Sequence, residues 1–481
     1  MILTLPDGRP APLLLLVLAL PLAAAVSVGL VRDPGLARRI ALGAALMEVA
    51  LALLAWSGYV PGGPACQLEE RLAWMPSLSA ELHLGLSAVS APLIPATALL
   101  FLVAMVGAWT RVVDTVRAWL ALLLLLEGCT IGVLLARDLA LFFLFWELSM
   151  VPVYVMTGFY GTGPERRFAA LKYALFMLAG GVPLLIAILM LGLYQGSVAD
   201  VGLNFNLDLI LTTPLPARFA LAVSVLLALG FAVKAPLFPL HSWLPNLALQ
   251  GPPSLVAALL GMKLGLYGLL VIAAPLVPVA SWGRPLAVVA GISAIFGAVV
   301  SLHQENLRRR LAYLSVSHVG VVALAIAAAT PASLAGARAA LVALSISGGG
   351  LFLLAGALHQ RLGSTSLLSM GGLARSAPRM GAVFLILALS SVGLPGTVGF
   401  VGEAGMLVGV LQRGAAWGAP MLLAMAVGAV ATFGVYQSVF LGPVRAEVTD
   451  LRPRERWIFG GLALLAVLLG LIPGWWLTSG A

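Results

Sequence analysis

The sequence has few charged residues and few cysteines, and both shortages exclude whole classes of protein. Only 9% of its 481 residues are Asp, Glu, Lys or Arg, against about 25% in ordinary globular chains, so polar shells around soluble domains cannot be built. Two cysteines, Cys66 and Cys129, cannot supply a disulfide framework, a four-thiolate zinc site or an iron–sulfur cluster. We therefore expect no metal site and no redox chemistry in this chain.

Apolar residues make up 61% of the chain and gather in long runs, and a helix that crosses a bilayer needs about 20 of them. These runs predict an all-α polytopic membrane protein with about fourteen crossings. The first run is too long for the apolar core of a secretory signal, so we expect it to be retained. The runs lie near 12–31, 40–58, 85–108, 118–136, 139–159, 170–195, 217–240, 254–277, 283–301, 311–329, 335–358, 380–411, 416–440 and 457–476.

The net charge of +9 is explained by topology. No basic stripe alternates with aromatic residues, as a nucleic-acid surface would require. Instead, eighteen of the 27 basic residues follow odd-numbered crossings and seven lie in the N-terminal segment and the other loops. Because cytoplasmic loops retain an excess of Lys and Arg, both termini are predicted to lie on the non-cytoplasmic side.

Two of the runs contain helix breakers beside an ionisable residue. Pro236 and Pro239 follow Lys234, and the glycine-rich stretch 393–402 precedes Glu403. Broken seventh and twelfth helices at matching positions indicate two five-helix repeats, inverted because each has an odd number of helices, which is a common plan for ion transporters. The expected divisions are 1–116 for the first three helices, 117–277 for the first repeat, 282–440 for the second repeat and 441–481 for the last helix.

Ionisable residues within these runs are the candidate functional residues. A charge at a helix centre costs roughly 2.5–3.5 kcal/mol on insertion scales, so such groups are expected to be paired or to face water. A line of them is what proton transfer through a bilayer requires. The candidates are Glu147, Lys234, Lys263, His318 and Glu403, with Lys172, Glu127 and His241 as secondary candidates.

Each candidate also has a structural interpretation. Glu147 and Lys234 could form a static ion pair, and Lys263 could extend to the membrane interface. Glu403 could cap a half-helix, and His318 could be a satisfied core histidine. Lys172, close to two arginines, could be an interfacial anchor. The spacing of Glu127 names no partner, and the Arg308–Arg310 run is interpreted as a topology signal.

Five segments closely resemble the antiporter-like subunits of respiratory complex I, NADH:quinone oxidoreductase. The match is to the chain M type, whose mitochondrial counterpart is NADH dehydrogenase subunit four, and it extends over about residues 80–475. The segments are DLALFFLFWELSMVPVY at 138–154, FAVKAPLFPLHSWLP at 231–245, LAYLSVSHVG at 311–320, FVGE at 400–403 and the stretch 441–455.

The resemblance implies fourteen helices in two inverted five-helix units, and a role for each candidate. Glu147 would be the modulating carboxylate beside Lys234, the proton-binding lysine of the seventh helix. Lys263 would be the connecting lysine, His318 would lie on the central polar axis, and Glu403 would be the terminal group.

The resemblance also implies partners and a location. They are membrane subunits of the L, N, K, J, A and H types, a peripheral arm with FMN and iron–sulfur clusters, and the lipid bilayer of a bacterial inner membrane. No cofactor is expected in this chain and no nucleic acid among its partners.

Three segments depart from the family pattern. The loop NLALQGPPS at 246–254 lacks the usual charges, LSISG at 344–348 lacks a histidine, and Ser87 stands where aspartate is usual. We expect water or serine to complete the polar axis at 344–348.

Two other functions remain open from the sequence. A subunit of an Mrp-type cation/proton antiporter would share the fold and many of these motifs. A non-conducting assembly scaffold would retain the helices without using the charges.

Overall fold

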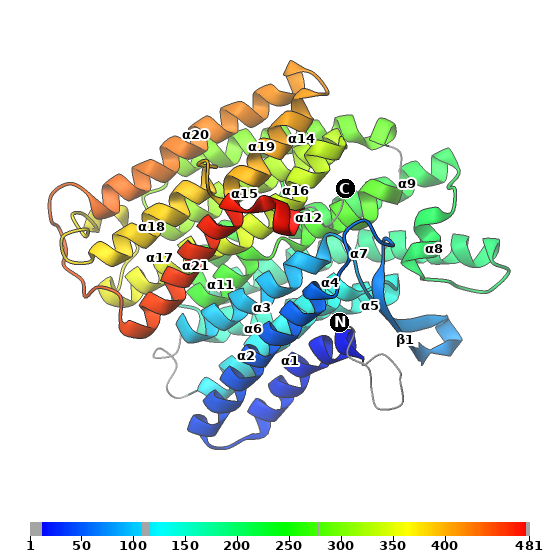
Figure 1. The fold of residues 1–481 in the computed structure, drawn as a ribbon, viewed down its shortest axis with the longest axis horizontal. Helices are drawn as coiled ribbons and strands as arrows, with labels where there is room; N and C mark the ends of the chain where they lie inside the picture. The colour runs from blue at the N-terminus through cyan, green and yellow to red at the C-terminus, as the bar shows by residue number, and fades with distance from the viewer. Residues whose placement is uncertain (1–11, 108–114, 277–278, 478–481) are drawn as a thin grey trace.

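The computed structural model describes residues 12–107, 115–276 and 279–477. Most of them lie in helices that run roughly parallel in one elongated bundle (Figure 1). The first half contains α1 Leu13–Leu30, α2 Pro34–Ser57, α3 Ser90–Gly107, α4 Val116–Leu135, α5 Leu139–Leu148, α6 Met150–Tyr160, α7 Arg166–Val198, α8 Leu207–Thr212, α9 Ala217–Lys234, α10 Trp243–Gln250, α11 Pro253–Gly261, α12 Leu264–Gly268 and α13 Ala274–Leu276. The second half contains α14 Val279–Leu302, α15 Leu307–Ala328, α16 Pro331–Ala343, α17 Gly349–Leu362, α18 Pro378–Ser391, α19 Val398–Leu411, α20 Ala415–Phe440, α21 Pro453–Leu471 and α22 Pro473–Leu477.

The predicted number of crossings is confirmed within the described ranges. Twelve helical segments are long and apolar enough to cross a bilayer. Two shorter apolar helices, α18 and α19, follow each other along the predicted twelfth run. The last crossing is α21, whose first turn carries Arg454, Glu455 and Arg456 before a continuous apolar stretch.

The predicted breaks in the seventh and twelfth crossings are confirmed. Helix α9 ends at Lys234, and the next helix begins only at Trp243. The twelfth crossing is interrupted between α18 and α19, where Gly393 and Gly396 adopt positive φ angles of 71° and 87°. A left-handed backbone is open to glycine without steric cost, so these two residues allow the chain to leave the helix inside the bundle.

Further interruptions were not predicted. The fifth crossing is divided at Ser149 into α5 and α6. The eighth is divided at Met262 and Lys263 into α11 and α12, and a π-helical turn, Leu269–Ala273, follows. The eleventh contains a similar turn, Leu344–Gly348, between α16 and α17. Such turns cluster at functional positions in helices.

The predicted all-α membrane fold is confirmed, and one loop adds a feature that was not predicted. Between α2 and α3, strands β1 Gln67–Met75 and β2 Ala80–Leu86 pair in an antiparallel hairpin, with Arg71 opposite His83. The third crossing therefore begins at Ser90 rather than near 85. The hairpin is anchored to the bundle at the start of α1. There the Glu70 carboxylate accepts hydrogen bonds from the backbone N–H groups of Leu14 and Leu15, both at 2.8 Å, which have no partner within the helix.

Glycines bring the two helices next to the second break into very close contact. A Cβ atom on Gly336 of α16 would lie 2.2 Å from the backbone nitrogen of Met406 in α19, and one on Gly409 would lie 2.1 Å from that of Ser333. Small residues are the usual means of close helix packing in membranes, where apolar burial does not drive association. The α16–α19 contact therefore holds the second half of the twelfth crossing firmly in place.

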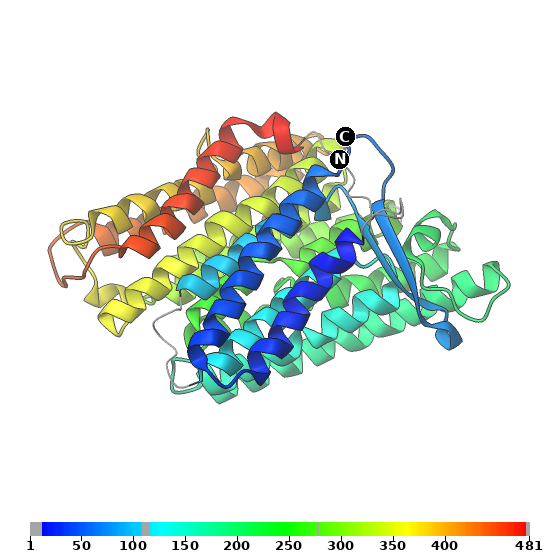
Figure 2. The same ribbon diagram turned by 60° about the horizontal axis from the view of Figure 1, so that its bottom comes forward.

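The start of α1, the end of α2 and α22 lie at the same end of the bundle as the hairpin. Trp475 of α22 packs on Trp56 at the end of α2, with ring centroids 5.4 Å apart. The hairpin and α8 also lie together at this end (Figure 2). At the opposite end, Arg308 donates to Thr162 and to the carbonyl oxygen of Gly251. The arginine-rich loops therefore gather on the side away from the hairpin.

Candidate functional site

Lys234 is the last residue of α9, and its side chain fills the break in the fifth crossing. The Nζ atom donates to the carbonyl oxygen of Trp146 at 2.7 Å and to Oγ of Ser149 at 2.7 Å. It also lies 4.1 Å from the centroid of the Trp146 ring. A carbonyl at a helix C-terminus and an aromatic face both favour a cation. The interrupted fifth helix thus provides a specific binding position for the ammonium group.

Glu147 lies next to this position but does not close an ion pair with Lys234. Among the described residues, no carboxylate oxygen lies within 4.0 Å of Lys234 Nζ, although the two charges interact electrostatically. The Glu147 carboxylate instead lies against α7, where a Cβ on Gly181 would be 2.4 Å from Oε1. The structure therefore brings the predicted pair close together without direct contact.

Lys263 occupies the unpredicted break in the eighth crossing. Its side chain is 6% exposed, and Nζ donates to Oγ of Ser315 at 2.5 Å. Ser315 precedes His318 by one turn on α15. Lys263 does not extend to an interface as the structural alternative supposed, and it connects the first half to the central helix of the second.

Two small cavities lie next to His318. Each has a volume of about 30 Å³, which is large enough for a water molecule where polar groups face it. The first is lined mostly by leucines and Phe352, and its polar residues are Ser315, His318 and Ser391. The second is bounded by His318, Ser390 and Glu403. Hydroxyl groups and room for water therefore join Lys263 to Glu403 through His318.

The eleventh crossing, which lacks the family histidine, has Ser345 and Ser347 in its π-helical turn. Ser347 lines the second cavity and its Oγ donates to Oγ of Ser390 at 2.8 Å. Ser345 donates to the carbonyl of Gly261 at 3.2 Å, directly before the break at Lys263. The site serines were not predicted, except for those at 344–348. The sequence did contain one indication of Ser315: it lies three residues before His318, so both face the same side of a helix.

Lys263, Ser315, His318 and Glu403 thus form a line of polar residues that ends at Glu403. Glu403 and Lys234 occupy different positions in their broken helices. Lys234 closes the first half of its broken helix, whereas Glu403 lies inside α19, the second half. Its Oε2 atom is buried and has no hydrogen-bond partner in the described part of the chain. A Cβ on Gly393 would lie 2.0 Å from this oxygen. The carboxyl group of Glu403 therefore lies directly against the break, on the α19 side of it.

The secondary candidates lie beside this line rather than on it. His241 is buried against Phe296, with ring centroids 4.9 Å apart, and it interacts electrostatically with Lys172. Glu127 is fully buried in α4, and neither carboxylate oxygen has a hydrogen-bond partner among the described residues. Its charged neighbour is Glu48 of α2 rather than a lysine.

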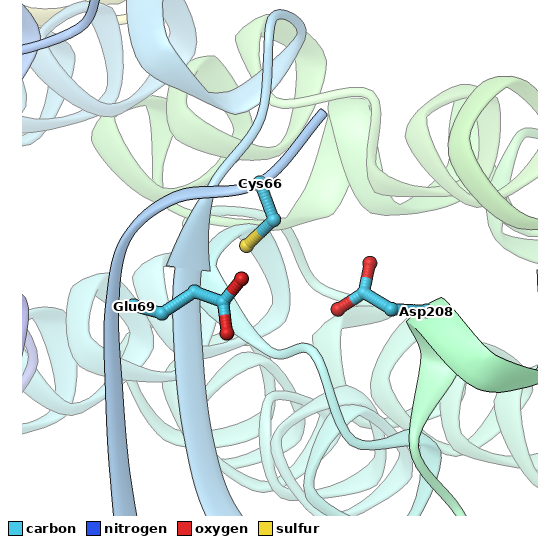
Figure 3. Close-up of side chains that lie close together, drawn as sticks. All are labelled: Cys66, Glu69 and Asp208. Atoms are coloured by element: carbon cyan, nitrogen blue, oxygen red, sulfur yellow. The ribbon is translucent and has the colours of Figure 1, made fainter. Parts of the chain in front are cut away.

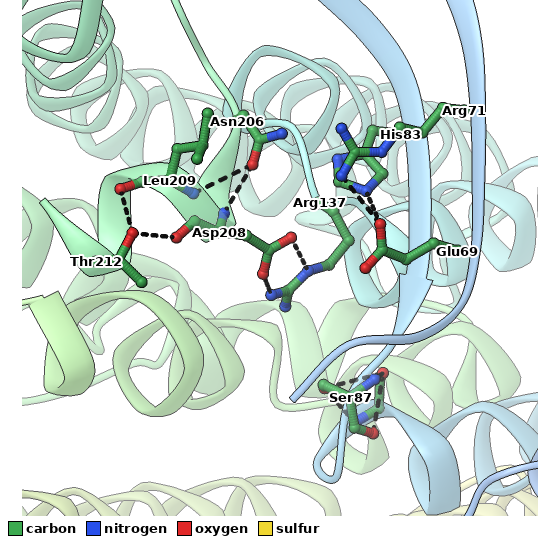
Figure 4. Close-up of polar contacts among 10 residues, drawn as sticks. Glu69, Arg71, His83, Ser87, Arg137, Asn206, Asp208, Leu209 and Thr212 are labelled. Atoms are coloured by element: carbon green, nitrogen blue, oxygen red, sulfur yellow. Dashed lines mark hydrogen bonds and ion pairs between the residues drawn. The ribbon is translucent and has the colours of Figure 1, made fainter. Parts of the chain in front are cut away.

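A polar cluster outside the membrane-spanning helices was missed in the sequence. Cys66, Glu69 and Asp208 lie close together at the hairpin end, with one ligand atom of each within 4.8 Å of the others (Figure 3). Both carboxylates already have partners: Asp208 pairs with Arg137, and Glu69 pairs with Arg71 at 3.0 Å (Figure 4).

The chemistry of this cluster favours a structural role. Burial raises the pKa of the Cys66 thiol to about 12, so the thiolate that metals bind is scarce near neutral pH. The paired arginines neutralise the two carboxylates. The cluster therefore joins the hairpin to α8 and to the start of α5.

The helical architecture, with its broken crossings, is that of an antiporter-like membrane subunit. A family model described as "NADH:quinone oxidoreductase/Mrp antiporter, TM" matches residues 136–431. The chain belongs to this family.

Similar proteins narrow the relationship within the family. The chain is 34% identical to "NAD(P)H-quinone oxidoreductase chain 4 1" of Picosynechococcus sp., over 97% of this chain and 90% of that protein. It is also 34% identical to "NADH-quinone oxidoreductase subunit M" of Pseudomonas aeruginosa, over 91% and 89%. The predicted resemblance to the chain M type is confirmed.

Solved structures agree with the fold. A chain of respiratory complex I from Thermus thermophilus superposes with a TM-score of 0.89 at 32% identity, covering 97% of both chains. A chain of the Mrp complex from a Dietzia species gives a TM-score of 0.84 at 25% identity, covering 96% of this chain but 50% of that one. The similarity to complex I is therefore the more complete.

Proposed function

We propose that this chain is the proton-translocating, antiporter-like subunit of an NADH:quinone oxidoreductase. Quinone reduction elsewhere in the complex would change the charge states along the buried line, and protons would cross the membrane as the groups load and unload. The observation that carries this proposal is the series Lys263, Ser315, His318 and Glu403, joined by a hydrogen bond and by two cavities large enough for water.

The Lys234 position supports the same function. A lysine inside the bilayer is costly, and here it is held by a backbone carbonyl and a hydroxyl rather than by a closed ion pair. Such a group can exchange a proton without separating two bound charges. A static packing pair, the structural alternative, would place the Glu147 carboxylate directly on the ammonium group.

The expected setting follows from the family. Partner chains of the L, N, K, J, A and H types and a peripheral arm with FMN and iron–sulfur clusters would supply the electron transfer, and this chain would hold no cofactor. The location would be a bacterial inner membrane, with both termini on the non-cytoplasmic side. The divisions at 117–277 and 282–440 are retained as the two proposed repeats.

An Mrp-type antiporter subunit is the second candidate. Its supporting observation is the match to the Dietzia structure, but this chain covers only half of that one. Purification of the native assembly separates the two candidates, because redox subunits should accompany this chain in complex I and should be absent from an Mrp assembly.

The central test replaces Lys234 with alanine in the intact complex. We expect assembly to survive and the number of protons pumped per electron to fall by at least several-fold, measured in vesicles with a pH-sensitive dye and quinone reduction. Arg284→Ala, which removes an exposed cation from α14, is the matched control. Unchanged pumping by an assembled Lys234→Ala complex would favour the scaffold and contradict the proposal.

A further inference from the structure

Arg310 is a largely buried arginine at the edge of a cavity. The residue lies in the first turn of α15 and is 8% exposed. Its Nε atom is buried without a hydrogen-bond partner in the described ranges. Arg308 in the same run donates to Thr162 and Gly251. A charge in such a place needs a counter-charge or water, and the side chain of Arg310 lines a cavity through which either can reach it.

The guanidinium group faces a large cavity at the end of α14, α15 and α20. This cavity has a volume of about 610 Å³, and Arg445 also lines it. The Nη2 atom of Arg310 lies over Gly434 of α20, where a Cβ would be only 2.8 Å away. The remaining wall combines apolar side chains, Leu302, Leu367, Met370 and Leu441, with polar ones, His303, Gln304, Gln437 and Ser438.

The cavity lies at the level where lipid headgroups meet the protein. Helix α14 ends at Leu302 and α20 ends at Phe440, so the cavity is at the limit of the apolar spans. At its mouth Leu368 is 63% exposed and Leu441 is 47% exposed, as suits side chains in contact with lipid. Glu305 is the one acidic residue in the described lining, and it is exposed.

We propose that this cavity binds the phosphate headgroup of an anionic phospholipid, held by Arg310 and Arg445. Arginine forms paired, charge-assisted hydrogen bonds with phosphate oxygens. Basic pockets between membrane helices bind such headgroups on the side where positive loops gather. The phosphate would supply the missing counter-charge, and the acyl chains would leave past Leu368 and Leu441. This proposal does not depend on the proposed proton pathway.

The test compares lipid retention in the purified, intact complex carrying Arg310→Met or Arg309→Met. Both variants remove one charge from the same loop, but Arg309 does not line the cavity. After a fixed detergent wash, bound phospholipid is quantified by mass spectrometry. We expect Arg310→Met to lose one anionic phospholipid per complex relative to the wild type, and Arg309→Met to lose none. Gly434→Ala, which keeps the charge but crowds Nη2, should also weaken retention.

A second measurement separates the sources of the phosphate. Added phosphatidylglycerol should raise the thermal stability of the delipidated wild-type complex more than phosphatidylcholine does, and this difference should vanish in Arg310→Met. If inorganic phosphate gives the same stabilisation, the cavity is a soluble-anion site and the lipid proposal is wrong. Equal lipid retention in all variants would overturn it, as would loss of a neighbouring subunit from Arg310→Met in place of lipid.

Discussion

Lys234 and Lys263 are held by hydrogen bonds to a backbone carbonyl and to serine hydroxyls. Lys234 rests on a carbonyl and a serine, and Lys263 rests on one serine hydroxyl. Neither is closed in an ion pair with a carboxylate in the part of the chain that the structure describes. Because hydroxyl groups both donate and accept hydrogen bonds, these positions suit either protonation state of the lysine.

Replacing Glu147 with glutamine should lower coupling while folding survives. The change removes the negative charge near Lys234 at nearly constant volume, so the lysine's affinity for its proton should change. Proton pumping per electron should fall several-fold in vesicles, with normal complex content on native gels. Gly181→Ala retains the charge but displaces it, because the new Cβ would lie 2.4 Å from Oε1, and we expect a smaller loss. Normal pumping by both variants would show that the carboxylate is only structural.

At Glu403 the nature of the replacement should matter. Glu403→Lys still places a titratable group at the second cavity, whereas Glu403→Ala leaves none there. We therefore expect the alanine variant to lose coupled activity several-fold more than the lysine variant, measured as quinone-dependent proton uptake. The opposite order would argue against a proton-carrying role for this position.

At the scale of elements, the interruptions organise the site. Breaks divide the fifth, seventh, eighth and twelfth crossings. Lys234 and Lys263 lie at two of these breaks, and the carboxyl group of Glu403 lies close to Gly393 in a third. A broken helix exposes backbone groups that only protein or water can satisfy at this depth. The hairpin is the contrasting element, since it lies outside the spans and is held by side-chain contacts.

The hairpin should loosen at mildly acidic pH because of His83. Burial lowers the pKa of His83 below its usual value of 6.5, so the unfolded hairpin binds a proton that the folded one does not. Stability is then complete above pH 6.5 and declines as the pH falls from 6.5 toward the lowered pKa. Hydrogen exchange of the β1 and β2 amides, corrected for intrinsic rates, should increase in this window. His83→Gln should abolish the pH dependence, and a wild-type hairpin insensitive to pH would contradict this explanation.

At the scale of the whole molecule, charge and packing agree on one orientation. The start of α1, the end of α2 and α22 lie on the same side as the hairpin. The arginine-rich loops gather on the opposite side. Because positively charged loops remain in the cytoplasm, the hairpin side should face the periplasm.

Reporter fusions can test this orientation. Alkaline phosphatase, which is active only outside the cytoplasm, should be active when fused after the last helix. The same enzyme fused in the α14–α15 loop, after Gln304, should be nearly inactive. Green fluorescent protein fusions at the two positions serve as the reciprocal control. Reversed activities would show that the predicted topology is wrong.

The amino-acid sequence by itself determined the crossings, the two main breaks and the identity of the buried charges. Length, apolarity and the positions of Pro, Gly and ionisable residues are local properties, and they can be read directly from the chain. Only the tertiary structure decided which groups meet: that Lys234 binds at Ser149, that Glu147 stands apart from it, and that serines and cavities join Lys263 to Glu403. These contacts join residues up to 88 positions apart, and such pairings depend on how the helices pack rather than on any local pattern.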